Sequence, residues 1–188
     1  MGKSKFNIMI DLKQGIRTVP NFPIEGIQFR DITSLVENPL YFNKALMDMT
    51  ASCMGFNATK LMAIESRGFL FASPIARDME VPLILARKPG KLPNPTYQRG
   101  YDLEYGKSEL HIQRNSDIKT DDKIVIIDDL IATGGTAKAC AGLVTQCFKV
   151  PKENILILAL IDLPNLGGSA IIQESGYEVH TLVEFEGD

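Results

Sequence analysis

The chain has 188 residues, 45% of them hydrophobic and 23% charged, and its 20 basic and 23 acidic residues leave a net charge of −3. This length fits one domain, and the mildly acidic balance argues against a nucleic-acid-binding protein, whose domain usually carries a basic excess. The 3 cysteines form no CxxC pair, which argues against a zinc site, and their odd number together with the lack of a secretion signal indicates a reducing cytoplasm. No apolar run approaches the ~18 residues that span a membrane, so no membrane partner is expected.

In chain order, the sequence predicts helices and strands that alternate. A short amphipathic helix carrying Leu12 and Ile16 comes first, and an irregular or extended segment with Pro20 and Pro23 follows it. A helix is then expected to start at Asn38–Pro39, because proline suits the first helical position. Later strands are expected at 60–64, 81–86, 108–114, 123–128, 154–161 and 178–184, and later helices at 68–79, 135–148 and 165–174.

Residues 87–106 contain three prolines and three glycines and have no helical period. They predict a long loop, or a loop plus a hairpin, and loops longer than ~12–15 residues are usually functional or disordered. Elsewhere, helices alternating with nearly continuous apolar strands indicate an α/β fold, in which a mainly parallel central sheet is flanked by helices. There is no repeat and no break in composition, so a single domain is expected over residues 1–188.

The stretch IVIIDDLIATGGTA, residues 124–137, joins four aliphatic residues to two acids and a glycine-rich loop. In parallel sheets, ligands bind beyond the carboxyl ends of the strands, where this loop is expected to lie. Gly134 and Gly135 let backbone N–H groups turn inward around an anion, and the following helix adds its positive N-terminus. The hydroxyls of Thr133 and Thr136 can donate further hydrogen bonds. The loop therefore suits a phosphate.

Asp128 and Asp129 do not suit a phosphate, since carboxylates repel it unless they hold a metal or hydroxyl groups. A ribose 5-phosphate resolves the conflict, because its phosphate fits the loop and its 2′- and 3′-hydroxyls can donate to the two acids. The sequence has neither GxxxxGKS/T nor GxGxxG, which excludes a P-loop NTPase and a dinucleotide-binding domain. A plain helix cap is the competing interpretation, but two adjacent acids at a buried strand end would then be desolvated without compensation.

The whole pattern resembles the signature of the type I phosphoribosyltransferases, in which this loop binds the ribose 5-phosphate of phosphoribosyl pyrophosphate (PRPP). The resemblance implies the fold of that family, an α/β core with a small hood and a mobile catalytic flap. It implies a PRPP site made of Asp128, Asp129, Ala132, Thr133, Gly134, Gly135 and Thr136.

Four further segments, in the same order along the chain, resemble those of the adenine phosphoribosyltransferases. They are FPIEGIQFRDIT at 22–33, ESRGF at 65–69, RKPGKLP at 87–93 and LEYGK at 103–107. The resemblance covers nearly the whole chain. It implies that residues 1–34 contribute to a base-binding hood and that residues 87–107 form a flexible loop and flap.

The pyrophosphate of PRPP is expected near the second and third of these segments. The ESRG segment follows a short strand and opens a helix, so its backbone N–H groups can meet an anion, and Arg67 adds a bidentate donor. The resemblance also implies a cis peptide between Glu65 and Ser66, and a reach of Arg87 across a dimer interface. Without the resemblance, the three cations Arg87, Lys88 and Lys91 would indicate only a run of solvated charges. The implied pyrophosphate site consists of Ser66, Arg67, Arg87, Lys88, Lys91 and Tyr105.

The implied adenine site consists of Gln28, Phe29, Arg30 and Leu163. Phe29 can stack on one purine face while free backbone groups read the purine edge, and by resemblance Leu163 packs on the other face. Plain core roles for Phe29 and Leu163 are also compatible with a single sequence. Glu104 resembles the catalytic glutamate, placed against N7 of the purine, where a carboxyl group can accept or donate a proton. A lone loop glutamate is otherwise only solvated. Tyr105 is expected to shape the closed flap.

The implied reaction is purine salvage, in which adenine and PRPP give AMP and pyrophosphate behind a flap that excludes water. Mg²⁺ is expected, held mainly by pyrophosphate, ribose hydroxyls and water, so no residue is named as a metal ligand. The family implies a homodimer, and no nucleic-acid or membrane partner is expected. Two alternatives stay open: transfer to xanthine, hypoxanthine or guanine, and a PRPP-binding regulator without catalysis. The lack of an added domain or a basic excess disfavours the regulator.

Overall fold

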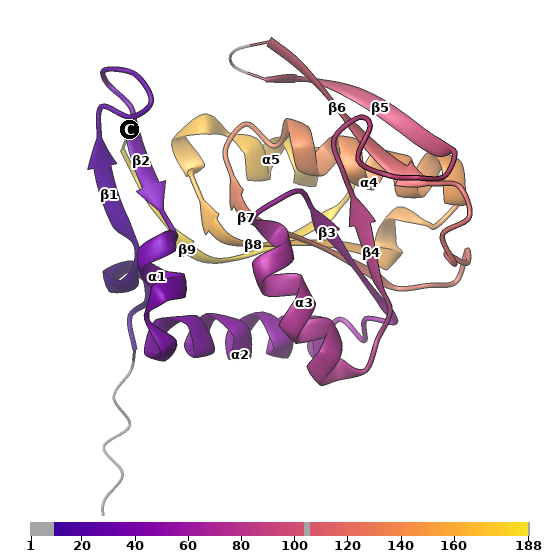
Figure 1. Cartoon of the computed structure of the whole chain (residues 1–188), viewed down its shortest axis with the longest axis horizontal. Helices are drawn as coiled ribbons and strands as arrows, with labels where there is room; N and C mark the ends of the chain where they lie inside the picture. Colours follow the sequence, from indigo (N-terminus) through magenta and orange to yellow (C-terminus); the bar gives the residue numbers. More distant parts are fainter. Residues whose placement is uncertain (1–9, 104–105, 188) are drawn as a thin grey trace, which may run out of the picture. The chain divides into compact units, whose positions relative to one another are not determined.

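The computed structural model of the chain describes residues 10–103 and 106–187, in two compact units that meet in sequence between Ala45 and Leu46 (Figure 1). The single domain expected over residues 1–188 stays a prediction. Among the described residues, no helix is both long enough and apolar enough to cross a membrane.

The first unit is built around a hairpin of two antiparallel strands, β1 (Arg17–Pro20) and β2 (Gln28–Asp31). A 3-10 turn, η1 (Leu12–Gly15), precedes the hairpin, where the sequence predicted a short helix. The segment predicted to be irregular or extended is thus largely extended. Helix α1 (Thr33–Glu37) follows, and helix α2 (Pro39–Gly55) begins at the predicted proline and ends in the second unit.

An ion pair joins the two strands of this hairpin at the end away from the turn. Arg17 and Asp31 are opposite each other in the register, and Arg17 Nη2 donates to Asp31 Oδ2 at 2.6 Å. The other Asp31 oxygen accepts from the backbone N–H and the hydroxyl of Thr33, at 2.9 and 2.7 Å. The hydrogen bond from Arg17, followed by those from Thr33, lowers the pKa of Asp31 to about 2. Asp31 therefore stays ionised and ties the strand that carries Gln28–Arg30 to helix α1.

The second unit is built on a five-stranded sheet with the strand order β4–β3–β7–β8–β9, in which every pair is parallel. Strands β3 and β8 are buried at every position, as expected for apolar strands that are covered on both faces. This sheet confirms the predicted α/β class. Its strands are β3 (Lys60–Ile64), β4 (Leu83–Ala86), β7 (Ile124–Ile131), β8 (Ile155–Asp162) and β9 (Glu178–Glu184).

Helices cover both faces of this sheet (Figure 1). Helix α3 (Gly68–Met79) lies on one face, and α4 (Gly135–Phe148) and α5 (Gly168–Glu174) lie on the other. The bounds of α3 and α4 agree with the prediction, whereas a 3-10 turn, η3 (Pro164–Leu166), takes the first part of the third expected helix. Another such turn, η2 (Lys152–Asn154), precedes β8. The core under α4 combines Met62, Ile126 and Ile157 of the sheet with Cys140 and Val144 of the helix.

The strand order reverses between β3 and β7. From β3 the chain moves outward to β4, and from β7 it moves the opposite way through β8 to β9. In open α/β sheets a crevice forms beyond the carboxyl ends of two such strands, because the loops that follow them leave in opposite directions. The fold therefore brings together the β3–α3 loop and the β7–α4 loop, which carry the two predicted anion-binding motifs.

Two features near the site refine the sequence prediction: one selects between its alternatives, and the other corrects a boundary. The segment expected as a loop, or a loop plus a hairpin, forms a hairpin of β5 (Thr96–Leu103) and β6 (Gly106–Gln113), which lies along α4 (Figure 1). Strand β7 was predicted to end at Asp128 but continues to Ile131. Pairing with β8 causes this extension, because Leu130 and Ile131 still have partners in Ile161 and Asp162.

Candidate active site

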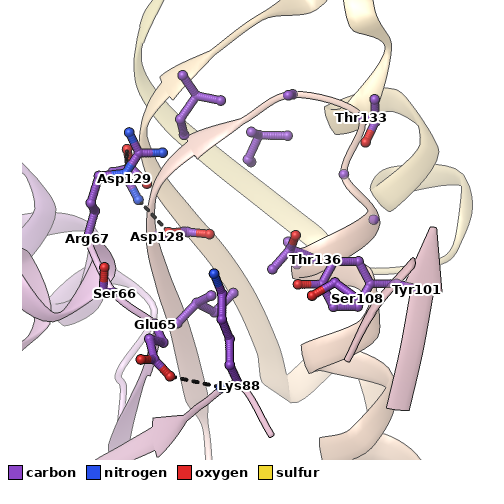
Figure 2. Close-up of a pocket in the computed structure, with 17 residues that line it drawn as sticks. Glu65, Ser66, Arg67, Lys88, Tyr101, Ser108, Asp128, Asp129, Thr133 and Thr136 are labelled. Atoms are coloured by element: carbon purple, nitrogen blue, oxygen red, sulfur yellow. Dashed lines mark hydrogen bonds and ion pairs between the residues drawn. The ribbon is translucent and has the colours of Figure 1, made fainter. Parts of the chain in front are cut away.

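A cavity of about 380 Å³ opens at the carboxyl ends of β3 and β7 (Figure 2). Its described lining comes entirely from the second unit: the β3–α3 loop, the β7–α4 loop, Lys88 and the β5–β6 hairpin. Every residue from Asp128 to Thr136 belongs to this lining. The cavity thus lies at the reversal of strand order, where ligand sites of open α/β sheets are found.

The β7–α4 loop has the backbone of an anion cradle. Gly134 has a φ of 77° and precedes α4, a helix of 14 residues whose first N–H groups lack partners inside the helix. A Cβ on Gly134 would lie 2.7 Å from the carbonyl oxygen of Gly168, and a Cβ on Gly168 would clash with the carbonyl oxygen of Ala132. Glycine is therefore required at both positions for the loop to close against the start of α5.

The two adjacent acids have different partners. Because they are neighbours in a strand, their side chains leave it on opposite faces. The Asp128 carboxylate accepts a hydrogen bond from the Asp129 N–H at 2.9 Å and points into the cavity (Figure 2). Asp129 is only 3% exposed, and its Oδ2 lies 3.0 Å from Arg67 Nε, in an ion pair without hydrogen-bond alignment.

Burial raises the pKa of both carboxyl groups. For Asp128 the charge of Asp129 adds to the effect of burial, and the pKa rises well above its ordinary value. For Asp129 the Arg67 guanidinium opposes the effect of burial, and the pKa is still raised. Groups that stabilise carboxylates, such as hydroxyl donors or a cation, would therefore favour the ionised pair.

The β3–α3 loop contributes Ser66 and Arg67 to the cavity. The peptide bond between Glu65 and Ser66 is cis, which confirms the expectation from the sequence. Helix α3 starts unusually close to strand β7, since a Cβ on Gly68 would lie 2.5 Å from the carbonyl oxygen of Ile127. Glycine at this position lets the N-terminus of the helix reach the cavity beside the acids of β7.

Glu65 organises the basic segment that follows β4. Its carboxylate accepts hydrogen bonds from the Lys88 N–H at 2.8 Å and from Arg87 Nη2 at 3.0 Å, and Arg87 Nη1 donates to the Lys91 carbonyl at 3.0 Å. Burial raises the pKa of Glu65, but the hydrogen bonds from Lys88 and Arg87 outweigh it, so the pKa is lowered. Of the three cations predicted here, Lys88 belongs to the described lining, whereas Arg87 and Lys91 do not.

The residues predicted to bind the base are divided between the two units. Gln28, Phe29 and Arg30 form β2 in the first unit, where the rings of Phe29 and Phe22 meet edge to face at 5.1 Å between centroids. Leu163 is half-buried and follows β8 in the second unit. The predicted catalytic Glu104 and its neighbour at 105, Tyr105, lie outside the described residues. The roles of all these residues stay predictions.

Comparison with known proteins agrees with this geometry. Residues 41–147 match the model of the phosphoribosyl transferase domain family. An adenine phosphoribosyltransferase of Shewanella putrefaciens is 42% identical over 177 residues, which are 94% of each chain. That of Haemophilus ducreyi is 42% identical over 176 residues, 94% of this chain and 96% of the relative. The chain belongs to the adenine phosphoribosyltransferase family.

Solved structures of adenine phosphoribosyltransferases share the fold. The protein from Thermoanaerobacter pseudethanolicus matches with a TM-score of 0.83 at 36% identity, over 93% of this chain and 98% of that one. The Giardia lamblia protein, complexed with 9-deazaadenine, matches with a TM-score of 0.85 at 29% identity, over 93% and 96% of the two chains. The family resemblance and the fold class that the sequence indicated are both confirmed.

Within this adenine phosphoribosyltransferase fold, the hairpin adds two residues that sequence reasoning missed. Tyr101 and Ser108 are direct partners across β5 and β6, and both line the cavity. The prolines and glycines of 87–106 concealed the strand that carries Tyr101. The available signal was the glycine content of this segment, since two runs separated by a short stretch that contains glycine indicate a hairpin, in which residues of the two strands lie opposite each other.

Proposed function

We propose that the chain transfers the 5-phosphoribosyl group of PRPP to adenine, producing AMP and pyrophosphate in purine salvage. The observation that carries this proposal is the cavity at the strand reversal, which combines a backbone anion cradle, an inward carboxylate and two cations. The choice of adenine is supported by relatives named for this activity that align with 94% of the chain.

The described residues suit PRPP as follows. The cradle from Ala132 to Thr136 binds the 5-phosphate through backbone N–H groups and the two threonine hydroxyls. Asp128 and Asp129 accept hydrogen bonds from the ribose hydroxyls, with the larger share falling to Asp128 because Asp129 is already paired with Arg67. Ser66, Arg67 and Lys88 bind the pyrophosphate, and Tyr105 joins them from the flap.

Arg87 and Lys91 support the pyrophosphate site indirectly in this proposal. Arg87 holds Glu65 through Nη2 and holds the Lys91 carbonyl through Nη1. The same Glu65 carboxylate accepts the N–H of Lys88. The basic segment is therefore shaped around one ionised carboxylate, which positions the Lys88 side chain toward the cavity (Figure 2).

The chemical step exchanges one bond at C1′ of the ribose. The bond from C1′ to the pyrophosphate oxygen breaks, and pyrophosphate leaves with the electron pair. N9 of adenine forms the new bond, and the imidazole proton of adenine is released, with Glu104 near N7 as its acceptor. Arg67 and Lys88 stabilise the charge that develops on pyrophosphate, so catalysis depends on positioning and electrostatics more than on a protein nucleophile.

Base selection is assigned to Gln28, Phe29, Arg30 and Leu163. Phe29 and Leu163 pack on the two faces of the purine, and backbone groups of Gln28 and Arg30 read its edge. Adenine carries an amine donor where hypoxanthine and guanine carry a carbonyl, so the wrong base would leave a buried polar group unpaired.

The carboxylates of the cavity could supply only a small part of the ligands of Mg²⁺, so PRPP and water would have to supply the rest. Of the three carboxylates in the described lining, Glu65 is ion-paired with Arg87 and Asp129 with Arg67, while Asp128 has no such pair. The described residues contain no group of three or more metal-ligating side chains. We propose that PRPP oxygens and water hold the ion beside Asp128, where it would neutralise part of the pyrophosphate charge.

We also propose that the protein is a cytoplasmic homodimer. Met47, Met54 and Leu70 are exposed by 69%, 64% and 44%, and these side chains offer apolar surface that a second copy would cover. The three cysteines are free, which suits a reducing compartment. Light scattering coupled to size exclusion tests the dimer, and a mass of one chain, 20.8 kDa, would contradict it.

A turnover assay tests the function directly. The purified chain is mixed with PRPP, Mg²⁺ and one of adenine, hypoxanthine, guanine or xanthine, and the nucleotide product is measured. We expect AMP and pyrophosphate in equal amounts, and much slower turnover of the other three bases. Faster product formation with one of those bases would overturn the assignment of adenine. Binding of PRPP without turnover of any base would instead favour a regulator.

A further inference from the structure

A second cavity, of about 350 Å³, lies between strand β5, helix α4 and the turn from α5 to β9. It shares no residue with the described lining of the active-site cavity. Figure 1 shows β5 running along α4, with α5 beside it. From α4 the cavity receives Lys138, Gly142 and Thr145, which recur at intervals of three and four and so share one face of the helix.

The lining of this cavity is basic, although the chain as a whole is acidic. Arg99, Lys138 and Lys152 contribute three positive charges against one acid, Glu174. Lys152 is held in place, because its ammonium donates to the Ser175 carbonyl at 2.8 Å. The ammonium of Lys138 has no hydrogen bond or ion pair within the described part of the chain. The cavity therefore concentrates cations that the described residues do not neutralise.

The guanidinium of Arg99 lies against Gly142 of α4. A Cβ on Gly142 would lie 2.7 Å from the Arg99 Cζ and would clash with its Nη1, so the guanidinium can lie against α4 only because Gly142 has no side chain. This Nη1 is buried and has no hydrogen-bond partner among the described residues. A buried donor without an acceptor is unfavourable, and because Arg99 lines the cavity, an anion there would be attracted by the charge of its guanidinium.

The cations supply the donors of this cavity. The hydroxyls of Thr145 and Tyr177 are both occupied, because Thr145 Oγ1 donates to the Ala141 carbonyl at 3.0 Å and accepts from the Tyr177 hydroxyl at 3.1 Å. A guanidinium and two ammonium groups around one space match the oxygens of a phosphate group. A carboxylate ligand would use fewer of these donors.

We propose that this cavity is a second anion site, which binds a small molecule with a phosphate or diphosphate group through Arg99, Lys138 and Lys152. The space is larger than one phosphate group, so the rest of the ligand can lie along Gln146 and Tyr177. Arg99 belongs to the hairpin that carries Tyr101 and Ser108, and α4 begins at the phosphate cradle. An anion that bridges Arg99 and Lys138 therefore fixes the hairpin against α4 and links this site to the shape of the active-site cavity.

Isothermal titration calorimetry of the full chain with pyrophosphate tests the proposal. The wild-type protein is expected to bind two equivalents, one in each cavity. The substitution Lys138→Gln is expected to weaken one of them by ~10-fold or more, because it removes a charge-assisted contact. Gly142→Ala is expected to do the same without altering any charge, since the new methyl group displaces the Arg99 guanidinium. Circular dichroism establishes that both variants are folded.

Matched variants assign the two equivalents. Thr136→Val, in the phosphate cradle, is expected to weaken the other equivalent and leave the second site intact. Lys119→Gln removes an exposed lysine outside both cavities and is expected to bind like the wild type. Parallel titrations with inorganic phosphate and with ADP show whether a lone phosphate, a diphosphate or a nucleotide is preferred, and loss of any of them in Lys138→Gln and Gly142→Ala supports the site.

Two results would overturn the proposal. In one, Lys138→Gln and Gly142→Ala keep the wild-type stoichiometry and affinity for all three probes. In the other, a single-stranded oligonucleotide competes better than every small probe, so that the occupant is a nucleic acid. Because binding is measured directly, either result leaves the proposed transferase activity untouched.

Discussion

The two sides of the candidate active-site cavity differ in what they offer to an anion. The β7–α4 side, from Ala132 to Thr136, contains no cation and presents the backbone of a helix start closed by two glycine contacts. The opposite side presents Arg67 and Lys88, and each depends on an acid. Asp129 pairs with the guanidinium of Arg67, and Glu65 accepts the backbone N–H of Lys88.

This difference has a physical consequence. Anion binding by a backbone cradle depends on conformation alone, so one added side chain should abolish it and pH should affect it little. Anion binding by a charged site depends on ion pairs, so each lost pair should weaken it in part, and binding should follow the ionisation of the paired acids. Four substitutions, given in order of decreasing effect, test this difference.

The largest effect is expected from Gly134→Ala. The new Cβ meets the Gly168 carbonyl oxygen at 2.7 Å and strains a residue with a φ of 77°. Displacement of the cradle by about 1 Å can cost ~10²-fold, so kcat/KM for PRPP should fall at least that far. The matched control is Gly167→Ala, which has a φ of 71° but no atom within 4 Å of the new Cβ. It should lose only ~1 kcal/mol of stability. Equal kinetics of the two variants would show that the cradle does not depend on close packing.

Asp128→Asn should lower kcat/KM by ~10²-fold, because the amide is a weaker acceptor for ribose hydroxyls. It should also stabilise the protein by about 1 kcal/mol at pH 7, since a partly buried carboxylate beside Asp129 no longer has to ionise. The pKa of Asp128 is raised on folding, so the wild-type free energy of unfolding should fall as pH rises above the ordinary value of 3.8. Urea unfolding across this range should show a shallower slope in the variant. A variant less stable than the wild type at pH 7 would contradict the assignment.

Arg67→Lys tests the charged side. Lysine cannot contact Asp129 and still offer a planar pair of donors to pyrophosphate, so KM for pyrophosphate in the reverse reaction should rise ~10-fold. The control is Arg77→Lys near the end of α3, where, within the described part of the chain, the exposed arginine pairs with its neighbour Asp78 at 2.6 Å. That variant should behave like the wild type. An unchanged KM in Arg67→Lys would remove Arg67 from the pyrophosphate site.

The smallest effect is expected from Glu65→Gln, which should cost ~1–2 kcal/mol of stability at pH 7 because the Arg87 guanidinium loses its charged partner. The pKa of Glu65 is lowered on folding, so its contribution exists above the ordinary value of 4.5 and disappears as pH falls through the lowered pKa. Urea unfolding at pH 7 and near pH 3 should therefore show a difference between variant and wild type that shrinks in acid. A constant difference would mean that ionisation of Glu65 is irrelevant.

Some of the site could be predicted because its signals are local. Gly134 and Gly135 before an apolar helical pattern indicate an anion cradle whatever the rest of the fold is. Helix α4 indeed begins at Gly135, as predicted. Which of Asp128 and Asp129 points into the cavity and which pairs with Arg67 could not be predicted in this way. Alternation along a strand places them on opposite faces, but only the approach of α3 decides that Arg67 pairs with Asp129.

The same distinction explains the errors at boundaries. Strand β7 was predicted to end at Asp128, because charged residues usually terminate an apolar run. In the structure, pairing with β8 extends the strand to Ile131. Tyr101 and Ser108 were missed because a segment rich in proline and glycine does not show a strand pattern. Both features depend on hydrogen-bonding partners that are distant along the chain.

The α/β class, the family and the glycine-rich loop before α4 follow from the sequence alone, since these depend on periodicity, glycine positions and motifs that act within a few residues. The tertiary structure alone decided which cations face the cavity, which acid each one pairs with, and how a second basic cavity forms between β5 and α4. The physical reason is that ion pairing and burial depend on distances between segments, which the strand order of the sheet sets and no local pattern encodes.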